Sequence, residues 1–280
     1  MPLAAVIQMN STSQVDDNLA IARALLESAS RRGAVLAALP ENFAIMGKTE
    51  SDKLAVAEDD QDDCRGGPIQ EWLSKTAREL NLWIIGGTVP IRAGEKVAAA
   101  CLTIDAKGQR RARYDKMHLF DVDVRTEDEG RRNERYRESA TIVAGHTPVV
   151  VDTPLGRVGL AVCYDMRFPE LFRHLVKQGA QVLSMPAAFT VPTGQAHWDV
   201  LLRARAIENL CYVLAPAQVG IHASGRETYG NALIVDPWGV VIDRVDNQVT
   251  GGAGIALAKI DTDAQAHVRE TFPALQHRLM

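Results

Sequence analysis

Two stretches of this 280-residue chain share one pattern, and this constrains the fold more than any other feature of the sequence. Residues 33–43 are GAVLAALPENF and residues 179–189 are GAQVLSMPAAF, so a glycine, an alanine, a proline and a phenylalanine align without a gap. Each copy has a glycine suited to end a helix, an apolar run of strand length and a proline that ends the strand. The repeat predicts an α/β fold with two pseudo-equivalent layers, with a chance likeness between two buried strands as the alternative.

The two copies differ at the residue after the proline, which is Glu41 in the first copy and Ala187 in the second. Only one copy therefore keeps a carboxylate at this position. Because α/β sheets commonly build their sites at the carboxyl ends of strands, Glu41 is a candidate site residue behind a predicted strand over 34–39. An exposed glutamate without a role is the alternative when this residue is considered alone.

Apolar periodicity and turn residues predict the other elements. Helices are expected to begin near Ser13, with Asp16 as a capping-box acid, and at Pro68 and Pro169. A further helix is expected over 198–209, and a short one near the end of the chain. Strands are expected over 3–9, 34–39, 82–87, 98–104, 110–114, 148–152, 156–162, 181–185, 211–215, 232–235, 240–245 and 255–260.

Two segments lack periodicity. Residues 46–66 are polar and acidic and should form a surface loop that can hold a helical turn. Residues 121–145 are highly charged, and 126–137 contain almost no apolar side chain. Such a length without structure is usually functional or mobile, and order is expected to return at Glu138.

Composition excludes several classes of function. The formal net charge of −4 gives no electrostatic reason to expect a nucleic acid or an anionic membrane as partner. No basic leader and no apolar run of membrane-spanning length is visible, so we expect a cytoplasmic protein. The cysteines are far apart without a C-x-x-C pair, which argues against a zinc knuckle, a redox dithiol or disulfides; they are Cys64, Cys101, Cys163 and Cys211.

A thiol follows the predicted strand over 156–162. Cys163 is succeeded by a short polar turn, and Pro169 is well placed as the first residue of a helix. A fold can present a nucleophile in this way, because N–H groups at a helix start would favour the thiolate and neighbouring amides can bind an oxyanion. A buried cysteine that packs as a small hydrophobe is the alternative.

Lys116 also follows a predicted strand, so it shares its placement with Glu41 and Cys163. An acid, an amine and a thiol form a coherent set for acyl transfer. Glu41 would accept the thiol proton while Cys163 attacks a carbonyl, and Lys116 would stabilise the oxyanion together with the backbone amide of Tyr164. Glu41 would then deprotonate the water that frees the acyl-enzyme.

Three motifs in this order resemble the nitrilase superfamily of carbon–nitrogen hydrolases: LPE at 39–41, YDKMHLFD at 114–121 and VCYDMRFPE at 162–170. The likeness runs from Leu3 to about Phe272. It implies a four-layer α-β-β-α sandwich, a single hydrolase domain over 1–280, no cofactor or metal, and a homodimer or larger homo-oligomer. It also implies the site residues, with Glu41 as general base, Lys116 as cationic stabiliser, Cys163 as nucleophile and Glu138 orienting Lys116 and the substrate amide.

Within this family the residues look most like the Nit branch, on the motifs at 165–170, 188–198 and 202–208. Branch members hydrolyse the terminal amide of α-keto amides, so the resemblance implies an amidase that releases ammonia. Substrate would be held by Arg167, Phe189 and Thr193, and an arginine suits a carboxylate or keto oxygen. A structural ion pair of Arg167 with Glu170 or Asp165 is the alternative.

The segment 217–231, together with 211–213, looks more like the subgroup that acts on deaminated glutathione than like the one that acts on α-ketoglutaramate. The arginine-rich loop 125–137 matches neither subgroup, and it could close over the site and change substrate choice. A binding or scaffold protein on the same fold is the alternative from another class. His118 and His197 are expected to be structural, and the glycines at 251–254 to form a turn.

Overall fold

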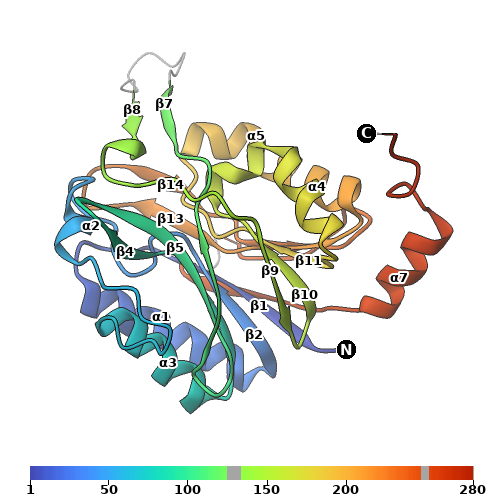
Figure 1. Cartoon of the computed structure of the whole chain (residues 1–280), viewed down its shortest axis with the longest axis horizontal. Helices are drawn as coiled ribbons and strands as arrows, with labels where there is room; N and C mark the ends of the chain where they lie inside the picture. Colours follow the sequence, from blue (N-terminus) through green and yellow to red (C-terminus); the bar gives the residue numbers. More distant parts are fainter. Residues whose placement is uncertain (125–133, 247–251, 280) are drawn as a thin grey trace.

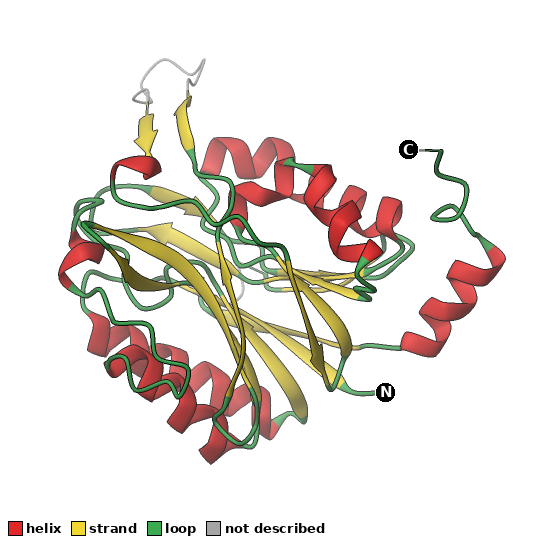
Figure 2. Ribbon diagram, in the orientation of Figure 1, coloured by secondary structure: helices red, strands yellow, loops and turns green. Residues whose placement is uncertain are grey.

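Two β-sheets lie face to face, and helices cover the outer side of each (Figures 1 and 2). The computed structural model describes residues 1–124, 134–246 and 252–279 of the chain. Helices α1 and α3 cover one sheet and helices α4 and α5 cover the other, so the order of layers is α-β-β-α. The fold expected from the family resemblance is confirmed.

The larger sheet has nine strands, and its main path runs β14-β13-β1-β2-β3-β5-β4, while β17 also pairs with β1 and β6 with β5. Its strands are β1 (Leu3–Met9), β2 (Ala34–Leu39), β3 (Trp83–Gly86), β4 (Val89–Ala93), β5 (Lys96–Ile104), β6 (Arg110–Asp115), β13 (Ala217–Ile221), β14 (Glu227–Tyr229) and β17 (Gly254–Lys259).

The smaller sheet has six strands in the order β16-β15-β12-β11-β10-β9. They are β9 (Val149–Thr153), β10 (Gly156–Leu160), β11 (Val182–Ser184), β12 (Tyr212–Ala215), β15 (Leu233–Val235) and β16 (Val241–Arg244). A separate two-stranded ribbon consists of β7 (Asp121–Val124) and β8 (Glu134–Arg137). The helices are α1 (Val15–Arg31), α2 (Asp52–Ala55), α3 (Pro68–Leu80), α4 (Pro169–Lys177), α5 (Val191–Asn209) and α7 (Thr262–Thr271).

The two halves of the chain repeat one topology. In the first half, β1, β2 and β3 are parallel neighbours connected through α1 and α3, and β5 then pairs antiparallel with β3. In the second half, β10, β11 and β12 are parallel neighbours connected through α4 and α5, and β15 pairs antiparallel with β12. The doubled stretch of sequence contains β2 in one half and β11 in the other, so the predicted pseudo-equivalence is confirmed.

Side chains of β1 alternate between two cores. Ala4 and Val6 belong to the apolar core between the two sheets, whereas Ala5, Ile7 and Met9 belong to the core under α1 and α3. Because successive side chains of a strand point to opposite faces, a strand in the middle of this sandwich is apolar at nearly every position; the exception in β1 is Gln8, whose buried Oε1 accepts from the backbone N–H of Ala232 at 2.8 Å. This explains why the predicted strands are continuous apolar runs.

Each half packs a helix closely against a glycine of its sheet. A Cβ atom on Gly86 of β3 would lie 2.9 Å from Leu73 Cδ1 of α3. A Cβ atom on Gly159 of β10 would lie 3.1 Å from Leu175 Cβ of α4. The absence of a side chain at these positions therefore permits the helices to approach the strands.

The beginnings of two helices differ from the prediction. Helix α1 begins at Val15, and its N-cap is Gln14, without a side-chain cap bond, so Ser13 does not form the expected capping box. Helix α5 begins at Val191 rather than near residue 198. Its first turns pack through Gly194, where a Cβ would lie 2.3 Å from Tyr229 Cβ, and so show no apolar periodicity.

Several strands were not predicted. The segment 121–145 was expected to be irregular up to Glu138, yet β7 and β8 pair within it over four register positions. Ion pairs such as Arg137 to Asp123, at 3.2 Å, connect the two strands of this ribbon, so its sequence lacks the apolar alternation on which the prediction depends.

Strands β4, β13 and β14 were also missed, because they are short and contain proline, glycine or charged residues. The arginine-rich loop tip at 125–133 lies outside the described residues, as does residue 251 of the expected glycine turn, whereas Gly252 lies in a turn and Gly254 begins β17. None of the helices in the described ranges is long and apolar enough to cross a membrane.

Candidate active site

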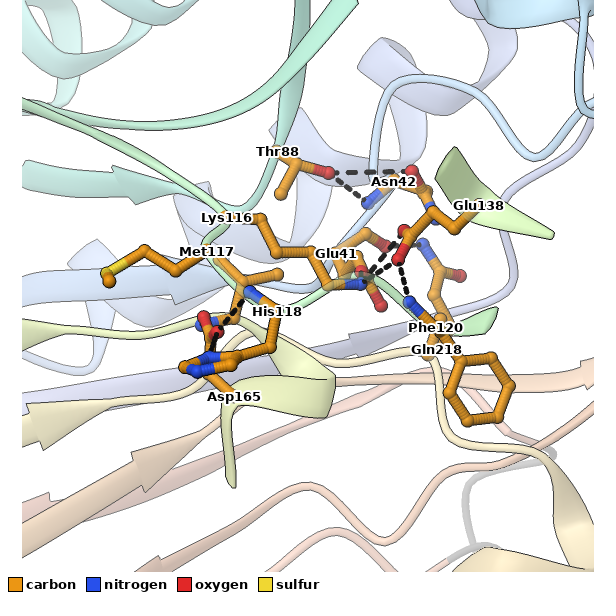
Figure 3. Close-up of polar contacts among 12 residues, drawn as sticks. Glu41, Asn42, Thr88, Lys116, Met117, His118, Phe120, Glu138, Asp165 and Gln218 are labelled. Atoms are coloured by element: carbon orange, nitrogen blue, oxygen red, sulfur yellow. Dashed lines mark hydrogen bonds and ion pairs between the residues drawn. The ribbon is translucent and has the colours of Figure 1, made fainter. Parts of the chain in front are cut away.

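Three buried side chains meet where β2, β6 and β10 end. Glu41 is 3 % exposed, Lys116 1 % and Cys163 7 %, and all three line one cavity with an empty volume of about 530 Å³. Figure 3 shows Glu41 and Lys116 pointing toward one another from separate strand ends. The structure thus brings together the three residues that the sequence placed after strands.

The backbone around Glu41 is fixed on both sides. Asn42 has a left-handed φ of 56°, and its N–H donates to Thr88 Oγ1 at 2.8 Å (Figure 3). The carbonyl oxygen of Glu41 accepts from Gln218 Nε2 at 3.0 Å. A tight turn after Pro40 therefore directs the carboxylate into the cavity.

Lys116 lies between two carboxylates. Its Nζ donates to Glu41 Oε1 at 2.8 Å and to both carboxylate oxygens of Glu138, each at 2.8 Å (Figure 3). Glu138 also accepts from the backbone N–H of Phe120 at 2.7 Å. A buried ammonium is favourable only when it is paired and hydrogen-bonded, and this arrangement satisfies both conditions.

Cys163 begins a 3₁₀ turn, η2 (Cys163–Arg167), directly after the strand end. Its φ of 49° is in the left-handed region, which a residue other than glycine adopts at a cost of about 1–2 kcal/mol. The backbone N–H of Cys163 donates to the carbonyl oxygen of Pro186 at 2.9 Å. The nucleophile candidate is therefore held on a sharp backbone turn, as reactive residues often are.

Asp165 joins the turn of Cys163 to the segment that carries Lys116. It is fully buried and accepts from the backbone N–H of Val162 at 2.8 Å and from the hydroxyl of Tyr114 at 2.7 Å. Its other oxygen accepts from the backbone N–H of His118 at 3.0 Å and contacts the ring Nδ1 at 2.7 Å (Figure 3). His118 also stacks on Phe168 with 3.7 Å between ring centroids and does not line the cavity, in agreement with its expected structural role.

The electrostatics of the site determine its resting protonation. Burial alone would raise the pKa of Glu41, but the charge of Lys116 and its hydrogen bond hold the pKa of this carboxyl below its usual range. Burial would lower the pKa of Lys116, yet Glu138 and Glu41 raise it well above the usual range. Burial, and then the negative charge of Glu41, raises the pKa of the Cys163 thiol well above its usual range.

The resting site therefore holds a carboxylate, an ammonium and a neutral thiol, and all three groups line the same cavity. The expectation that a helix start favours the thiolate of Cys163 is wrong, because α4 begins only at Pro169 and the sulfur is buried beside a carboxylate. A base must remove the thiol proton as the sulfur attacks, and Glu41 is in place to accept it.

The three expected substrate-binding residues line the same cavity. The Arg167 guanidinium lies 5.7 Å from the ring centroid of Tyr164 and 5.6 Å from that of Phe189, and its nitrogens lie 3.3 and 3.4 Å from Nδ1 of His197. Thr193 lies in the first turn of α5, and its hydroxyl is 2.8 Å from that of Thr190. His197 lies inside α5 rather than before it, so its expected position was wrong.

The alternative role of Arg167 is not observed. Within the described residues Arg167 forms no ion pair, and both oxygens of Asp165 are occupied by other donors. Its guanidinium is therefore available to a ligand in the cavity.

Several residues of the cavity were missed as site residues, among them Arg226 and Tyr136. Arg226, before β14, and Tyr136, in β8, line it, and the Arg226 guanidinium lies 4.9 Å from the Tyr136 ring centroid. One Nη of Arg226 donates to the carbonyl oxygen of Ala188, whereas its buried Nε has no hydrogen-bond partner in the part of the chain that the structure describes. The sequence pointed only to the segments that contain these two residues: 217–231 through the family likeness, and 125–137 as a loop that could close over the site.

No group of three potential metal ligands occurs among the described residues. The chemistry that this arrangement supports uses a thiol, a carboxylate and an ammonium.

The family profile for carbon–nitrogen hydrolases matches residues 3–270. The chain belongs to this family. Its relatives include proteins named deaminated glutathione amidase from Synechocystis, 44 % identical over 99 % of this chain and 98 % of that protein, and from Homo sapiens, 39 % identical over 99 % and 82 %.

Two solved carbon–nitrogen hydrolase structures are similar to the whole chain. The Caenorhabditis elegans NitFhit protein superposes with a TM-score of 0.87 at 36 % identity, covering 99 % of this chain and 65 % of that longer one. Saccharomyces cerevisiae Nit3, a member of branch 10 of the nitrilase superfamily, has a TM-score of 0.86 at 26 % identity and covers 100 % and 97 %. The protein is accordingly a hydrolase of carbon–nitrogen bonds.

Proposed function

We propose that this carbon–nitrogen hydrolase is an amidase that cleaves the amide of an α-keto amide, with deaminated glutathione as the preferred substrate. The observation that carries the proposal is the convergence of Glu41, Lys116 and Cys163 in one cavity, with the Lys116 ammonium hydrogen-bonded to the Glu41 carboxylate at 2.8 Å. The names of relatives that match nearly the full chain support the choice of substrate.

In the first step the Cys163 sulfur attacks the amide carbonyl carbon, and the thiol proton passes to Glu41. The carbonyl oxygen becomes an oxyanion, which Lys116 and the backbone N–H of Tyr164 stabilise. Glu138 holds Lys116 in position through both carboxylate oxygens and can also orient the substrate amide.

In the second step the C–N bond breaks, and Glu41 returns its proton to the leaving nitrogen. The leaving amine is ammonia only for a primary amide such as α-ketoglutaramate. For deaminated glutathione, whose pieces are α-ketoglutarate and cysteinylglycine, the leaving amine is the dipeptide. The ammonia release expected from the sequence therefore applies to the primary amide alone.

In the third step Glu41 deprotonates a water molecule that attacks the thioester on Cys163. A second tetrahedral oxyanion forms in the same place, and its collapse releases the acid and restores the thiol. Glu41 thus acts as base, acid and base again, which requires a carboxylate that is ionised in the resting state.

The acyl part of the substrate would lie beside Arg167, Phe189 and Thr193. The Arg167 guanidinium has no ion pair within the described residues and can form forked hydrogen bonds with the carboxylate of an α-keto acid. Phe189 supplies an apolar wall, and the Thr193 hydroxyl supplies a further polar contact.

Two other functions compete with this one. An ω-amidase that acts on α-ketoglutaramate would use the same machinery with a smaller leaving group. A scaffold protein on this fold would not need a buried carboxylate–ammonium pair next to a thiol, and such a pair is costly to bury.

The test compares kcat/KM for deaminated glutathione and for α-ketoglutaramate side by side, with cysteinylglycine and ammonia as the products detected. We expect deaminated glutathione to be strongly preferred. In Cys163→Ala, kcat should fall by about 10⁴-fold or more while the circular dichroism spectrum stays native. Unchanged turnover in this variant would exclude the mechanism, and inactivity of the wild type on both amides would favour the scaffold.

We further propose that the chain works as one domain over 1–280, in the cytoplasm, and as a homodimer or larger homo-oligomer. Exposed apolar side chains on α5 and on the turn between β15 and β16 support self-association: Val200, Ile207, Trp238 and Val240. Light scattering at micromolar concentration tests the oligomeric state. A monomer throughout would exclude it.

A further inference from the structure

An outer chamber opens from the catalytic cavity. It has an empty volume of about 1210 Å³, including solvent at its mouth, and lies between the 46–53 segment, β8 and the 224–226 turn. Both cavities share one set of lining residues: Asn42, Glu50, Lys53, Tyr136, Arg137 and Arg226. Cys163, Arg167 and Thr193 line only the inner cavity, so the two chambers have distinct ends.

The lining of the outer chamber is predominantly basic. Among its described residues one is acidic, Glu50, and five are basic: Lys48, Lys53, Arg135, Arg137 and Arg226. Such a surface favours an anionic ligand.

Two cations of the chamber, Lys48 and Arg226, form no ion pair within the described residues. Lys53 pairs with Glu50 at 2.7 Å, and Arg137 pairs with Asp123 at 3.2 Å. Arg226 has no ion pair in the described ranges, and its Nε is buried without an acceptor. A buried N–H donor without an acceptor is unfavourable, and a carboxylate oxygen from a ligand would satisfy it.

The outer chamber lies on the side from which the amine leaves. The leaving nitrogen must lie beside Glu41, because this residue supplies its proton. Glu41 lines the inner cavity together with Arg226, and Arg226 also lines the outer chamber together with Glu50 and Lys53, so the outer chamber opens beside the general acid. Atoms attached to the leaving nitrogen therefore extend into the outer chamber, while the acyl group lies at the Arg167 end.

We infer that the outer chamber binds the leaving amine of a substituted amide, with a carboxylate of this amine held by Arg226 and Lys53. The inference rests on the proposed amidase function and makes it more specific. It predicts that amides whose amine portion is an acidic, peptide-like chain are preferred. Primary amides, and amides whose amine portion carries no negative charge, should be cleaved less efficiently.

The test uses two substrates that differ only at the far end of the leaving group: deaminated glutathione, and its analogue in which the glycine carboxylate is a carboxamide. Both share the acyl group and the scissile bond, so effects on Cys163 or Glu41 cancel in the ratio of their kcat/KM values. We expect the wild type to prefer the free acid by about tenfold or more.

The ratio should fall toward one in Arg226→Gln and, to a smaller extent, in Lys53→Met. Lys75→Met on α3 is the matched control, because Lys75 is an exposed lysine whose only ion pair in the described residues is with Glu79 at 3.9 Å. It removes one positive charge far from the cavity and should leave the ratio unchanged. Two variants are used so that a folding defect in one does not decide the result.

Three outcomes would overturn the inference. Equal kcat/KM for acid and carboxamide in the wild type would overturn it while the amidase function stands. A preference that both variants retain would do the same. Failure of the wild type to cleave either amide would remove the proposed function and this inference together, and ammonia release from α-ketoglutaramate would then distinguish a smaller substrate from a scaffold.

Discussion

The corners after β2 and β11 derive from the same repeated stretch, yet only one of them carries chemistry. After β2 the proline is followed by Glu41, which points into the cavity, and after β11 it is followed by Ala187, which is fully buried. Gln218 lies between them: its side chain donates to the carbonyl oxygen of Glu41 at 3.0 Å and its backbone N–H to that of Ala187 at 2.9 Å. Equivalent backbone positions of the two copies are thus bound by one residue.

The second corner supports what the first one does. The carbonyl oxygen of Pro186 accepts from the backbone N–H of Cys163, and that of Ala188 accepts from Arg226. The phenylalanines differ as well, since Phe43 is fully buried and Phe189 lines the cavity. The comparison teaches that the shared sequence pattern specifies a backbone corner, while single substitutions decide whether the corner supplies a reactive group or a wall.

The largest expected effect comes from removing the group that distinguishes the first corner. In Glu41→Gln, kcat/KM for deaminated glutathione should fall by about 10²–10⁴-fold, because no base accepts the thiol proton. Lys116 keeps its bonds to Glu138, so the fold should persist. Steady-state kinetics together with urea unfolding measure both effects.

The matched control is Glu27→Gln on α1, which removes a half-exposed carboxylate paired with Arg23. It should change kcat/KM by less than about twofold, since surface substitutions rarely act on a distant site. Full activity of Glu41→Gln would mean that the two corners do not differ in chemistry.

The next largest effect is expected at Asp165, which connects the turn of Cys163 to the segment that carries Lys116. Asp165 accepts from four donors, and an asparagine would turn an NH₂ group toward two of them. Asp165→Asn should lower the free energy of unfolding by about 1–3 kcal/mol and lower kcat, because the Cys163 turn and the Lys116 segment lose their connection. Urea unfolding and kcat measure the two losses.

Glu170→Gln is the control for charge removal near the turn, because Glu170 lies outside the cavity lining in the first turn of α4. If Asp165→Asn kept both native stability and full kcat, the proposed connection between the segments would be wrong.

Particular residues show how far the sequence alone could predict this site. Glu41, Lys116 and Cys163 could be selected because each follows an apolar run, and parallel strands end at a common edge. Arg226 and Tyr136 could not, since their segments are held by ion pairs and short register-matched strands that leave no periodic signal. Protonation could not be predicted either, because the state of a thiol depends on burial and on neighbours that are distant in sequence.

The repeated corners were predicted from sequence for the same physical reason. A strand buried on both faces is apolar at nearly every position, and a proline cannot donate to a ladder and so marks the end of both strands, so the pattern is recognisable in both copies. The start of α5 was misplaced because Gly194 packs against Tyr229 where an apolar side chain would have marked the helix face.

A smaller effect concerns the ionisation of the thiol. Burial and the negative charge of Glu41 both raise the pKa of Cys163, so the wild-type thiol should remain neutral at pH 7. Glu41→Gln removes the charge but leaves the burial. The Cys163 thiolate should therefore form at lower pH in the variant than in the wild type.

Thiolate absorbance near 240 nm against pH, with Cys163→Ala subtracted, measures this shift. In Lys75→Met the Cys163 thiol should titrate as in the wild type, because Lys75 is an exposed residue of α3. A thiolate that forms at higher pH in Glu41→Gln would show that Glu41 does not oppose ionisation in the resting site.

The smallest expected effect lies in the backbone of the two corners. Asn42 adopts a left-handed φ of 56°, whereas the aligned residue of the second copy, Ala188, is not among the described residues other than glycine with positive φ. Asn42→Ala should therefore lower the free energy of unfolding by about 1 kcal/mol, and Asn42→Gly should lower it by less, because glycine adopts this conformation without strain.

Urea unfolding of both variants provides the comparison, with Ala188→Gly as the matched change at the second corner. There the glycine should destabilise, since it adds freedom to the unfolded chain without relieving strain. If Asn42→Gly were the more damaging of the two changes at Asn42, contacts of the side chain rather than backbone strain would distinguish the corners.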